Sequence, residues 1–391
     1  MRNRRGFLGV ALAAGLLTVA CSQGCNKSGK GDIAGEGSNE IVIGAYLSLS
    51  GSDSTFGTDT RDGVDLALEE QTAAGGIKGK KVKVLYEDDK SNPNEASNKV
   101  RQLIDRDHAV AILGEVASSR SLAGGLICNT KKVPMVTPSS TAVEVTKDRE
   151  YVFRVCFTDD QQGDVAARFV KETLKKNNVG LFYVAQDTYS SGLAKSFKDS
   201  FTKIGGTIVA EKGYQKGDTN FTTYLGDLKA KNPEVIFAPV YYNDMVQIAR
   251  QAKQAGIPGS MFVGGDGWDS ANLIDGAGDE LEGAYFTNHY APDVPWENSQ
   301  KFVAAYRAKY KHDPTSLAAQ GYDAAKLLFD AIGRATEPKP EAIKIALAAT
   351  TGFKGATGTL TIDKNHNANK PIVVVQVKGK KFVYSTQLTA Q

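Results

Sequence analysis

The chain has 391 residues, 41% of them hydrophobic, and a net charge of only +3, because 47 Lys and Arg nearly balance 44 Asp and Glu. This length is more than one hydrophobic core usually organises, so we expect two domains. Basic and acidic residues interleave along the chain, and this pattern argues against a nucleic-acid-binding face.

The amino terminus predicts an export signal over residues 1–20. Three arginines precede the apolar run 7–20, which is too short to span a bilayer comfortably. Residues 3–8 resemble the twin-arginine pattern, although arginine pairs also occur in general secretory signals. The run Thr-Val-Ala before Cys21 resembles a lipoprotein cleavage box, so we predict a lipid anchor on Cys21. An ordinary cleaved signal with an incidental cysteine is the alternative.

Residues 21–40 predict a flexible tether. The segment is rich in Gly, Ser, Lys and Asn and holds hardly an apolar residue, so it cannot bury enough surface to order itself. An acyl anchor with such a tether describes an exported protein held at a membrane and facing the periplasm or the cell exterior. Of the other cysteines, Cys25 falls in the tether. Cys128 and Cys156 fall in the folded region, either as a disulfide or as two buried thiols.

From residue 40 onward, short β-branched or apolar runs alternate with segments of helical period, which favours parallel sheets covered by helices. The expected strands of a first series are 41–47, 82–86, 109–114, 133–137 and 151–156. Those of a second series are 179–184, 207–210, 235–239, 261–264 and 284–287. Stripes such as Leu193, Phe197 and Phe201 indicate helices that pack on these sheets.

After helices around 302–310 and 317–331, the chain returns to strands at 360–362, 372–377 and 381–384. This return suggests that the chain crosses again between two lobes. Ligands of open parallel sheets bind beyond the carboxyl ends of the strands, so two facing sheets predict a site in the cleft between them. The loops at these ends are polar or rich in hydroxyl groups: 51–57, 115–119 and 138–141 in the first series, and 187–189, 241–244 and 264–269 in the second.

Several segments in the same order resemble the type I periplasmic binding proteins, in the leucine/isoleucine/valine-binding branch that serves ABC transporters. They are the turn 74–79, Val-Pro-Met at 133–135 before Ser-Ser-Thr, Phe-Arg-Val-Cys at 153–156 before 159–163, and Phe-Val-Gly-Gly-Asp at 262–266. The likeness covers about residues 40–385. It implies an α/β fold of two doubly wound parallel-sheet lobes joined by a multi-strand hinge. Lobe 1 would hold 41–160 and 290–358, and lobe 2 would hold 161–289 and 359–391.

The resemblance also implies the binding residues. Ser118 and Thr141 match the positions that hold an α-carboxylate, with backbone contacts from Ala117, Ser139 and Ser140. Independently, hydroxyls and amides at helix N-termini stabilise an anion. Asp266 matches the position that pairs with the α-ammonium, and Phe56, Tyr189, Tyr241 and Trp268 are the expected cleft walls. The alternatives are helix caps for the hydroxyl residues, a turn residue for Asp266, and ordinary packing for the aromatic residues.

We therefore expect a monomeric substrate-binding lipoprotein that closes its lobes on an amino acid, by resemblance Leu, Ile or Val, and serves ABC transporter permease subunits. No cofactor or metal is expected. An enzyme is disfavoured, because none of His108, His289, His312 and His366 sits in the loops considered above, and neither a zinc-type spacing nor a Walker-type loop occurs. A sensor subunit feeding a membrane partner shares the same fold and stays open.

Overall fold

The computed structural model describes residues 39–391, which form one compact unit. The expected export signal, the anchor residue Cys21 and nearly all of the expected tether lie outside the described residues. Within residues 39–391, no helix combines the length and apolar character needed to cross a membrane.

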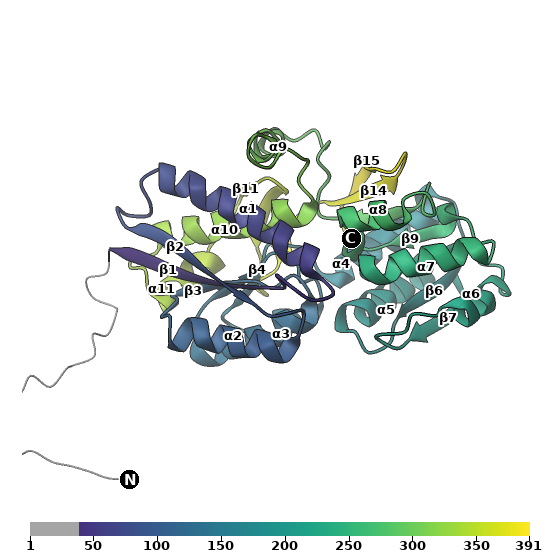
Figure 1. The fold of residues 1–391 in the computed structure, drawn as a ribbon, viewed down its shortest axis with the longest axis horizontal. Coiled ribbons are helices and arrows are strands. Elements are labelled where there is room, and N and C mark those ends of the chain that lie inside the picture. The colour runs from purple at the N-terminus through teal and green to yellow at the C-terminus, as the bar shows by residue number, and fades with distance from the viewer. Residues whose placement is uncertain (1–38) are drawn as a thin grey trace, which may run out of the picture. The chain divides into compact units, whose positions relative to one another are not determined.

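Lobe 1 is built on a five-stranded parallel sheet in the order β2-β1-β3-β4-β5. Ile43 of β1 pairs with Val84 on one side and Ala111 on the other, so β1 is a central strand. Figure 1 shows α1 and α10 on one face of this sheet and α2 and α3 on the other. The strands are β1 (Glu40–Leu47), β2 (Lys81–Asp88), β3 (Ala111–Leu113), β4 (Met135–Thr137) and β5 (Val152–Arg154), and the helices are α1 (Ser54–Ala73), α2 (Pro93–Asp105), α3 (Ser118–Lys131), α10 (Ser316–Arg334) and α11 (Pro340–Ala348).

Each face of the lobe 1 sheet has its own hydrophobic core. Ile43 points to the face where Val64 of α1 and Leu328 of α10 pack. Ile112 of β3 points to the opposite face and packs with Val100 of α2. A strand buried on both faces reads as a continuous apolar run, which is why these strands stand out in the sequence.

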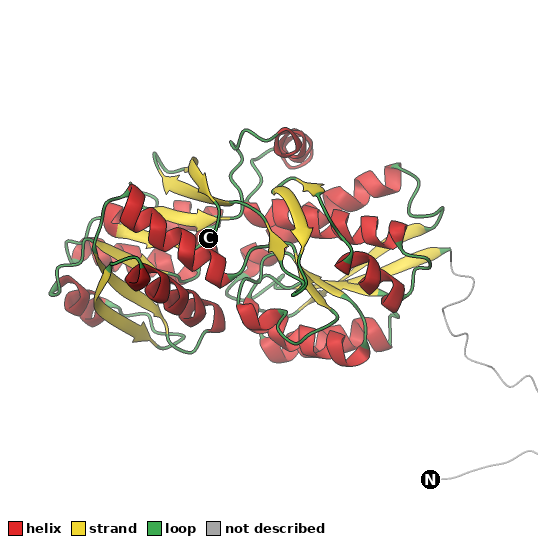
Figure 2. Ribbon diagram, turned by 180° about the vertical axis from the view of Figure 1, so that it is seen from behind, coloured by secondary structure: helices red, strands yellow, loops and turns green. Residues whose placement is uncertain are grey.

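Lobe 2 is built on a seven-stranded sheet in the order β15-β14-β10-β9-β8-β6-β7. β14 runs antiparallel to its two neighbours, β10 and β15, and the other pairs are parallel. Seen from behind, strands of both lobes lie between helices (Figure 2). The strands are β6 (Asn178–Val184), β7 (Thr207–Tyr214), β8 (Val235–Ala238), β9 (Phe262–Gly264), β10 (Tyr285–Asn288), β14 (Ile372–Val377) and β15 (Phe382–Leu388). The helices are α4 (Asp159–Arg168), continued by a π-helical turn (Phe169–Thr173), α5 (Thr188–Lys203), α6 (Thr222–Lys229), α7 (Tyr242–Gln254) and α8 (Ala271–Ala277).

The predicted helical stripes are core packing. Leu193, Phe197 and Phe201 of α5 are buried together against the sheet, and the ring of Phe197 stacks on that of Phe237 with centroids 4.0 Å apart. The two sheets and the helices that cover them confirm the expected α/β fold of two lobes, and all of the expected strands appear.

After β10 the chain passes through α9 (Glu297–Tyr310) to α10 and α11 of lobe 1. A small sheet of β11 (Phe353–Gly355), β12 (Gly358–Ile362) and β13 (Ala368–Asn369) follows. The strands β11 and β13 are additions to the expected set. Leu360 and Ile362 of β12 are buried in the lobe 1 core, and the chain rejoins the lobe 2 sheet at β14.

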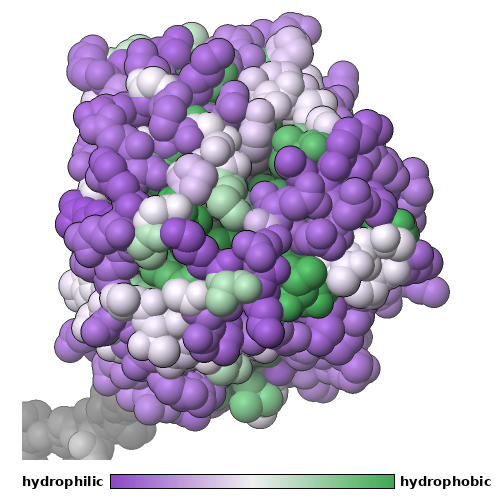
Figure 3. Space-filling model, turned by 90° about the vertical axis from the view of Figure 1, so that its right-hand side faces the viewer, coloured by the Kyte–Doolittle hydropathy of each residue, from purple (hydrophilic) through white to green (hydrophobic). Residues whose placement is uncertain are grey.

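Cys128 and Cys156 are two separate buried thiols in the structure, so the alternative without a bridge is the one observed. Burial raises the pKa of both thiols, that of Cys156 to about 12. Among the described residues, the large hydrophobic side chains that are exposed are Leu126 and Ile345. Figure 3 shows the lobe 2 end of the molecule as mostly hydrophilic, with small separate apolar patches.

Candidate functional site

The first of the predicted carboxylate-binding loops joins β3 to α3. β3 ends at Leu113 and α3 begins at Ser118, so Ala117 and Ser118 stand at the helix N-terminus. Gly114 opens the loop with a φ of +126°, and a Cβ there would lie 2.2 Å from the Tyr46 carbonyl oxygen, so only glycine fits. The first N–H groups of a helix have no partner inside it, which leaves them available to an anion.

The second loop, residues 139–141 after β4, is tied to the first. The Ser140 hydroxyl lies 2.9 Å from the Glu115 carbonyl oxygen and 2.6 Å from the Ser121 hydroxyl. The Ala142 N–H donates to Ser118 Oγ over 3.2 Å. The side chain of Ser140 therefore joins the two loops.

Two hydroxyl groups of this second loop are buried at the site. Ser139 Oγ makes no hydrogen bond within residues 39–391, and Thr141 Oγ1 lies beside the Asp159 carboxyl group. A buried polar group without a partner costs free energy, so native structures keep such groups mainly where a ligand or water satisfies them. The two loops thus present hydroxyls and backbone N–H groups, which is the chemistry that an α-carboxylate requires.

Two buried cations hold the second loop from the side of the hinge. The Arg154 guanidinium donates to the Ser140 carbonyl oxygen over 2.7 Å. The Lys370 ammonium donates to Gln320 Oε1 over 2.9 Å, and Gln320 Nε2 donates to the Pro138 carbonyl oxygen, also over 2.9 Å. Both chains of hydrogen bonds end on backbone carbonyls of the loop, so these residues orient its hydroxyl groups.

On the lobe 2 side, Asp266 follows β9 and opens a 3-10 turn. Gln162 Nε2 donates to one carboxylate oxygen over 3.0 Å, and His289 Nε2 lies 3.0 Å from the other. Burial lowers the pKa of His289, although the hydrogen bond to Asp266 opposes this shift, so the neutral ring donates through Nε2. Asp266 is 7% exposed, and no Lys or Arg of the described chain forms an ion pair with it.

Asp159 links the two halves of the site. Its N–H donates to the Thr141 carbonyl oxygen over 2.8 Å, and its buried carboxyl group lies beside the Thr141 hydroxyl. Burial, followed by the charge of Asp266, raises the pKa of Asp159 well above its usual range. Two carboxyl groups next to the Thr141 loop form a place where a cation is stabilised.

The predicted tyrosines are stacked face to face. The ring centroids of Tyr189 and Tyr241 lie 5.1 Å apart at an interplanar angle of 2°, and the Tyr189 hydroxyl accepts from the Gly267 N–H over 3.0 Å. Trp268 is fully buried in the core of lobe 2, where its indole N–H donates to the Ala238 carbonyl oxygen over 3.1 Å. Tyr189 therefore helps to position the turn that carries Asp266.

Phe56 contacts lobe 2 from the first turn of α1. Its ring lies 5.4 Å from the ring of Tyr241 and 5.1 Å from that of Tyr242, both in edge-to-face geometry. The Tyr242 hydroxyl donates across the same boundary to the Ser52 carbonyl oxygen over 3.0 Å. The strand-end loops of the two lobes are therefore in contact.

A buried ion cluster, missed in the sequence, braces the lobe 1 loops. The Arg120 guanidinium lies 2.7 Å from Asp53, 3.0 Å from Glu115 and 4.0 Å from Asp89, and all four side chains are at most 4% exposed. The three carboxylates come from the loops after β1, β2 and β3, so one guanidinium ties three strand ends together. Burial, with the neighbouring Glu115, raises the pKa of Asp89. We call these four residues the Arg120 cluster.

His289 is a site residue that the sequence did not predict. It directly follows β10, outside the predicted site loops, and its ring contacts Asp266. Its ring pairs with Asp266, a carboxylate, and stacks on Phe157 with centroids 4.0 Å apart, so it orients Asp266. Within residues 39–391, no three His, Cys, Asp or Glu side chains gather as a metal site.

Comparisons with known proteins agree with this geometry. The family model described as periplasmic binding protein matches residues 40–381. The chain is 29% identical over 326 residues to the leucine-, isoleucine-, valine-, threonine- and alanine-binding protein of Pseudomonas aeruginosa, covering 83% of this chain and 86% of that one. It is 30% identical over 308 residues to the Leu/Ile/Val-binding protein of Escherichia coli, covering 78% and 80%.

Solved structures give the same result. The leucine-binding protein LivK of Thermotoga maritima superposes with a TM-score of 0.86 at 36% identity, covering 89% of this chain and 99% of that one. The branched-chain amino acid transporter substrate-binding protein LivJ of Streptococcus pneumoniae, in complex with isoleucine, gives a TM-score of 0.83 at 32% identity, covering 90% and 99%. The chain therefore belongs to the periplasmic binding protein family, in the Leu/Ile/Val-binding branch of substrate-binding proteins that serve ABC transporters.

Proposed function

We propose that this protein binds one free amino acid between its lobes and delivers it to the permease subunits of an ABC transporter. Relatives are named for binding leucine, isoleucine and valine, so these three lead among the expected ligands. The protein would act by binding and release, without a cofactor and without covalent chemistry.

One observation carries this proposal: the buried hydroxyl loop of Thr141 lies beside two buried carboxyl groups of lobe 2, Asp159 and Asp266. Ser118 and Thr141, with the N-terminus of α3, offer hydroxyls and N–H groups for an α-carboxylate. Asp266, held by Gln162 and His289, offers a carboxylate for an α-ammonium. A zwitterion that carries both charges on one carbon matches this arrangement.

The two lobes would close around the ligand after it has docked. We propose that the α-carboxylate first binds to lobe 1, because both of its loops are already joined to each other there. Lobe 2 would then bring Asp266 onto the ammonium, and Phe56 would pack against Tyr241 and Tyr242. The closed form would be the one that the permease recognises.

Calorimetry with the 20 common amino acids tests the proposal directly. We expect saturable 1:1 binding of at least one of them. Thr141→Ala should weaken that binding about 10- to 100-fold, because a hydrogen bond to a charged group contributes about 1.5–3 kcal/mol. Ser119→Ala removes the neighbouring half-buried hydroxyl and serves as the matched control with unchanged affinity. Absence of binding to every amino acid would contradict the proposal.

A second experiment separates the role of Asp266 from a structural one. Asp266→Asn keeps the shape of the side chain and removes its charge, so it should weaken the amino acid about 10- to 100-fold. It should not weaken the same ligand without its amino group, such as 4-methylpentanoate in place of leucine. Equal losses for both ligands would show that the variant only disturbs the fold.

We also propose that the mature protein is a monomer held at the membrane by a lipid on Cys21. Wild-type protein should then partition into the detergent phase of a phase-separation assay, whereas Cys21→Ser should remain in the aqueous phase. Equal partitioning of the two proteins would refute the anchor. Light scattering on the Cys21→Ser protein should give the mass of a single chain, consistent with the few exposed hydrophobic side chains.

A further inference from the structure

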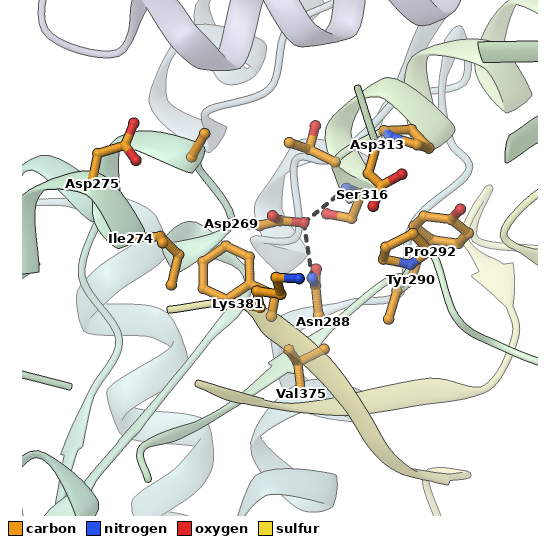
Figure 4. Close-up of a pocket in the computed structure, with 15 residues that line it drawn as sticks. Asp269, Ile274, Asp275, Asn288, Tyr290, Pro292, Asp313, Ser316, Val375 and Lys381 are labelled. Carbon is orange, nitrogen blue, oxygen red and sulfur yellow. Dashed lines mark hydrogen bonds between the residues drawn. The ribbon is translucent and has the colours of Figure 1, made fainter. Parts of the chain in front are cut away.

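A cavity of about 290 Å³ is lined by residues of lobe 2 and by the start of α10 from lobe 1 (Figure 4). It is formed by the segment after the Asp266 turn, by α8, by the end of β10, by the start of α10 and by β14 and β15. None of the predicted carboxylate, ammonium or cleft-wall residues lines it. Asp269 and Asn288, which do line it, neighbour the turn that carries Asp266 and the residue His289. The cavity is therefore adjacent to the proposed amino-acid site but distinct from it.

The deep end of this cavity is a buried carboxylate without a cation. Asp269 is 3% exposed, and its Oδ2 accepts from Asn288 Nδ2 over 2.9 Å and from the Ser316 N–H over 2.8 Å. The buried Ser316 hydroxyl lies on the side of Asp269 (Figure 4), where it favours the ionised carboxylate. No Lys or Arg within residues 39–391 forms an ion pair with Asp269, and a buried carboxylate in that situation is stabilised by a ligand cation.

The remaining walls are largely apolar. Ile274 of α8, Val375 of β14 and Phe382 of β15 line the space, with Pro292 closing another side. These side chains cannot hydrogen-bond, so they favour a hydrocarbon portion of a ligand. The volume is at the lower end of the range of small-molecule pockets, so it suits a small ligand.

The charged side chains at the mouth also favour a cation. Asp275 of α8 and Lys381 before β15 are both exposed, and neither forms an ion pair within the described chain. Asp313, the third carboxylate of the lining, is paired with Arg307. Burial raises the pKa of Asp269, so a ligand cation at this carboxyl group would favour its ionised form.

We propose that this cavity is a second small-molecule site, which binds a small primary alkylamine with its ammonium group on Asp269 and its alkyl chain against Ile274, Val375 and Phe382. The ammonium also reaches the Ser316 hydroxyl, which accepts one of its hydrogen atoms. Because the cavity and the amino-acid site have separate linings, the amine and an amino acid bind to the same molecule together.

The test uses 3-methylbutylamine, titrated by calorimetry into the full mature chain. We expect 1:1 binding with a Kd below about 10 mM. The uncharged 3-methylbutanol should bind at least about tenfold more weakly, because it lacks the charge-assisted bond to Asp269. No detectable binding of the amine, or equal binding of the alcohol, would overturn the proposal.

Variants of the two sites show which of them binds the amine. Asp275→Asn changes an exposed side chain and should weaken the amine severalfold, while Asp269→Asn should weaken it at least about tenfold. Asp266→Asn should leave amine binding unchanged. If only Asp266→Asn abolished amine binding, the amine would occupy the amino-acid site and the proposal would fail. Should Asp269→Asn prevent folding, a crystal soaked with the amine decides: density beside Asp269 supports the site, and its absence refutes it.

Discussion

Truncation of Phe56 tests whether closure of the lobes drives ligand binding. Phe56 is 1% exposed, and its ring meets Tyr241 and Tyr242 across the lobe boundary. Phe56→Ala removes these contacts only from the closed form, because a lobe 1 side chain loses them when the lobes separate. We therefore expect the variant to fold and to bind its amino acid much more weakly.

The magnitude follows from area and ring geometry. A buried Phe removes about 150–250 Å² from water, which at about 25 cal/mol per Å² is about 4–6 kcal/mol for complete burial. If lobe 2 provides roughly half of that burial, Phe56→Ala removes about 2–3 kcal/mol from the free energy of closure. Loss of the two edge-to-face ring pairs adds about 1 kcal/mol or more to this cost. A loss of about 3–4 kcal/mol weakens binding roughly 150- to 1,000-fold.

Two control variants distinguish closure from folding. Tyr242→Phe removes one hydrogen bond across the boundary, to the Ser52 carbonyl oxygen, and should weaken binding only about fivefold. Phe197→Ala removes a ring buried wholly within lobe 2 and should lower the melting temperature of the ligand-free protein with little effect on affinity. Calorimetry and thermal unfolding measure both quantities. Unchanged affinity in Phe56→Ala, or a melting temperature as low as that of Phe197→Ala, would refute the reasoning.

Three further predictions concern buried charges. Burial and Asp266 raise the pKa of Asp159, so a ligand ammonium should lower this pKa again and release a proton. The binding enthalpy should then depend on the ionisation enthalpy of the buffer. Asp159→Asn should remove that dependence. Burial lowers the pKa of Lys370 to about 8, so above that pH the unfolded chain holds more protons than the folded chain. The free energy of unfolding, measured by urea titration, should therefore rise by up to about 3 kcal/mol between pH 8 and 10. Lys370→Met should not show this rise. Arg120→Met leaves buried carboxylates unpaired and should cost about 3–5 kcal/mol in the same assay, whereas adding Asp53→Asn should recover part of the loss.

The strands were predictable because their signal is local. A buried parallel strand such as β8 (Val235–Ala238) is a short apolar run bounded by turn residues, and this is visible without knowledge of its neighbours. β11 and β13 have three and two residues, too few for a pattern. The loops that carry Ser118, Thr141 and Asp266 were predictable for a related reason, since they follow strands that the sequence identifies.

The partners of those loops were not predictable, because they depend on distant contacts. Gln162 lies 104 residues from Asp266, and in sequence it is one polar residue in the first turn of a helix. Arg120 in the first turn of α3 has the sequence pattern of an exposed basic residue, yet it is buried by carboxylates from three separate loops. For His289 a signal did exist, since it follows directly on an expected strand, and including every strand end in the search would have found it.

Both halves of the proposed site are organised before they meet, and this determines where selectivity arises. The carboxylate loops are joined by Ser140 and held by Arg154, while Asp266 is fixed by Gln162 and His289. A ligand therefore has little protein to order at its α-carbon, and most of the remaining free-energy cost lies in bringing the lobes together. Amino acids share the α-carbon groups, so in the proposed site these contacts would set a common affinity. The side chain would then discriminate by how well it permits Phe56 to pack against lobe 2, and a ligand that holds Phe56 away from lobe 2 would dock on lobe 1 without closing the protein.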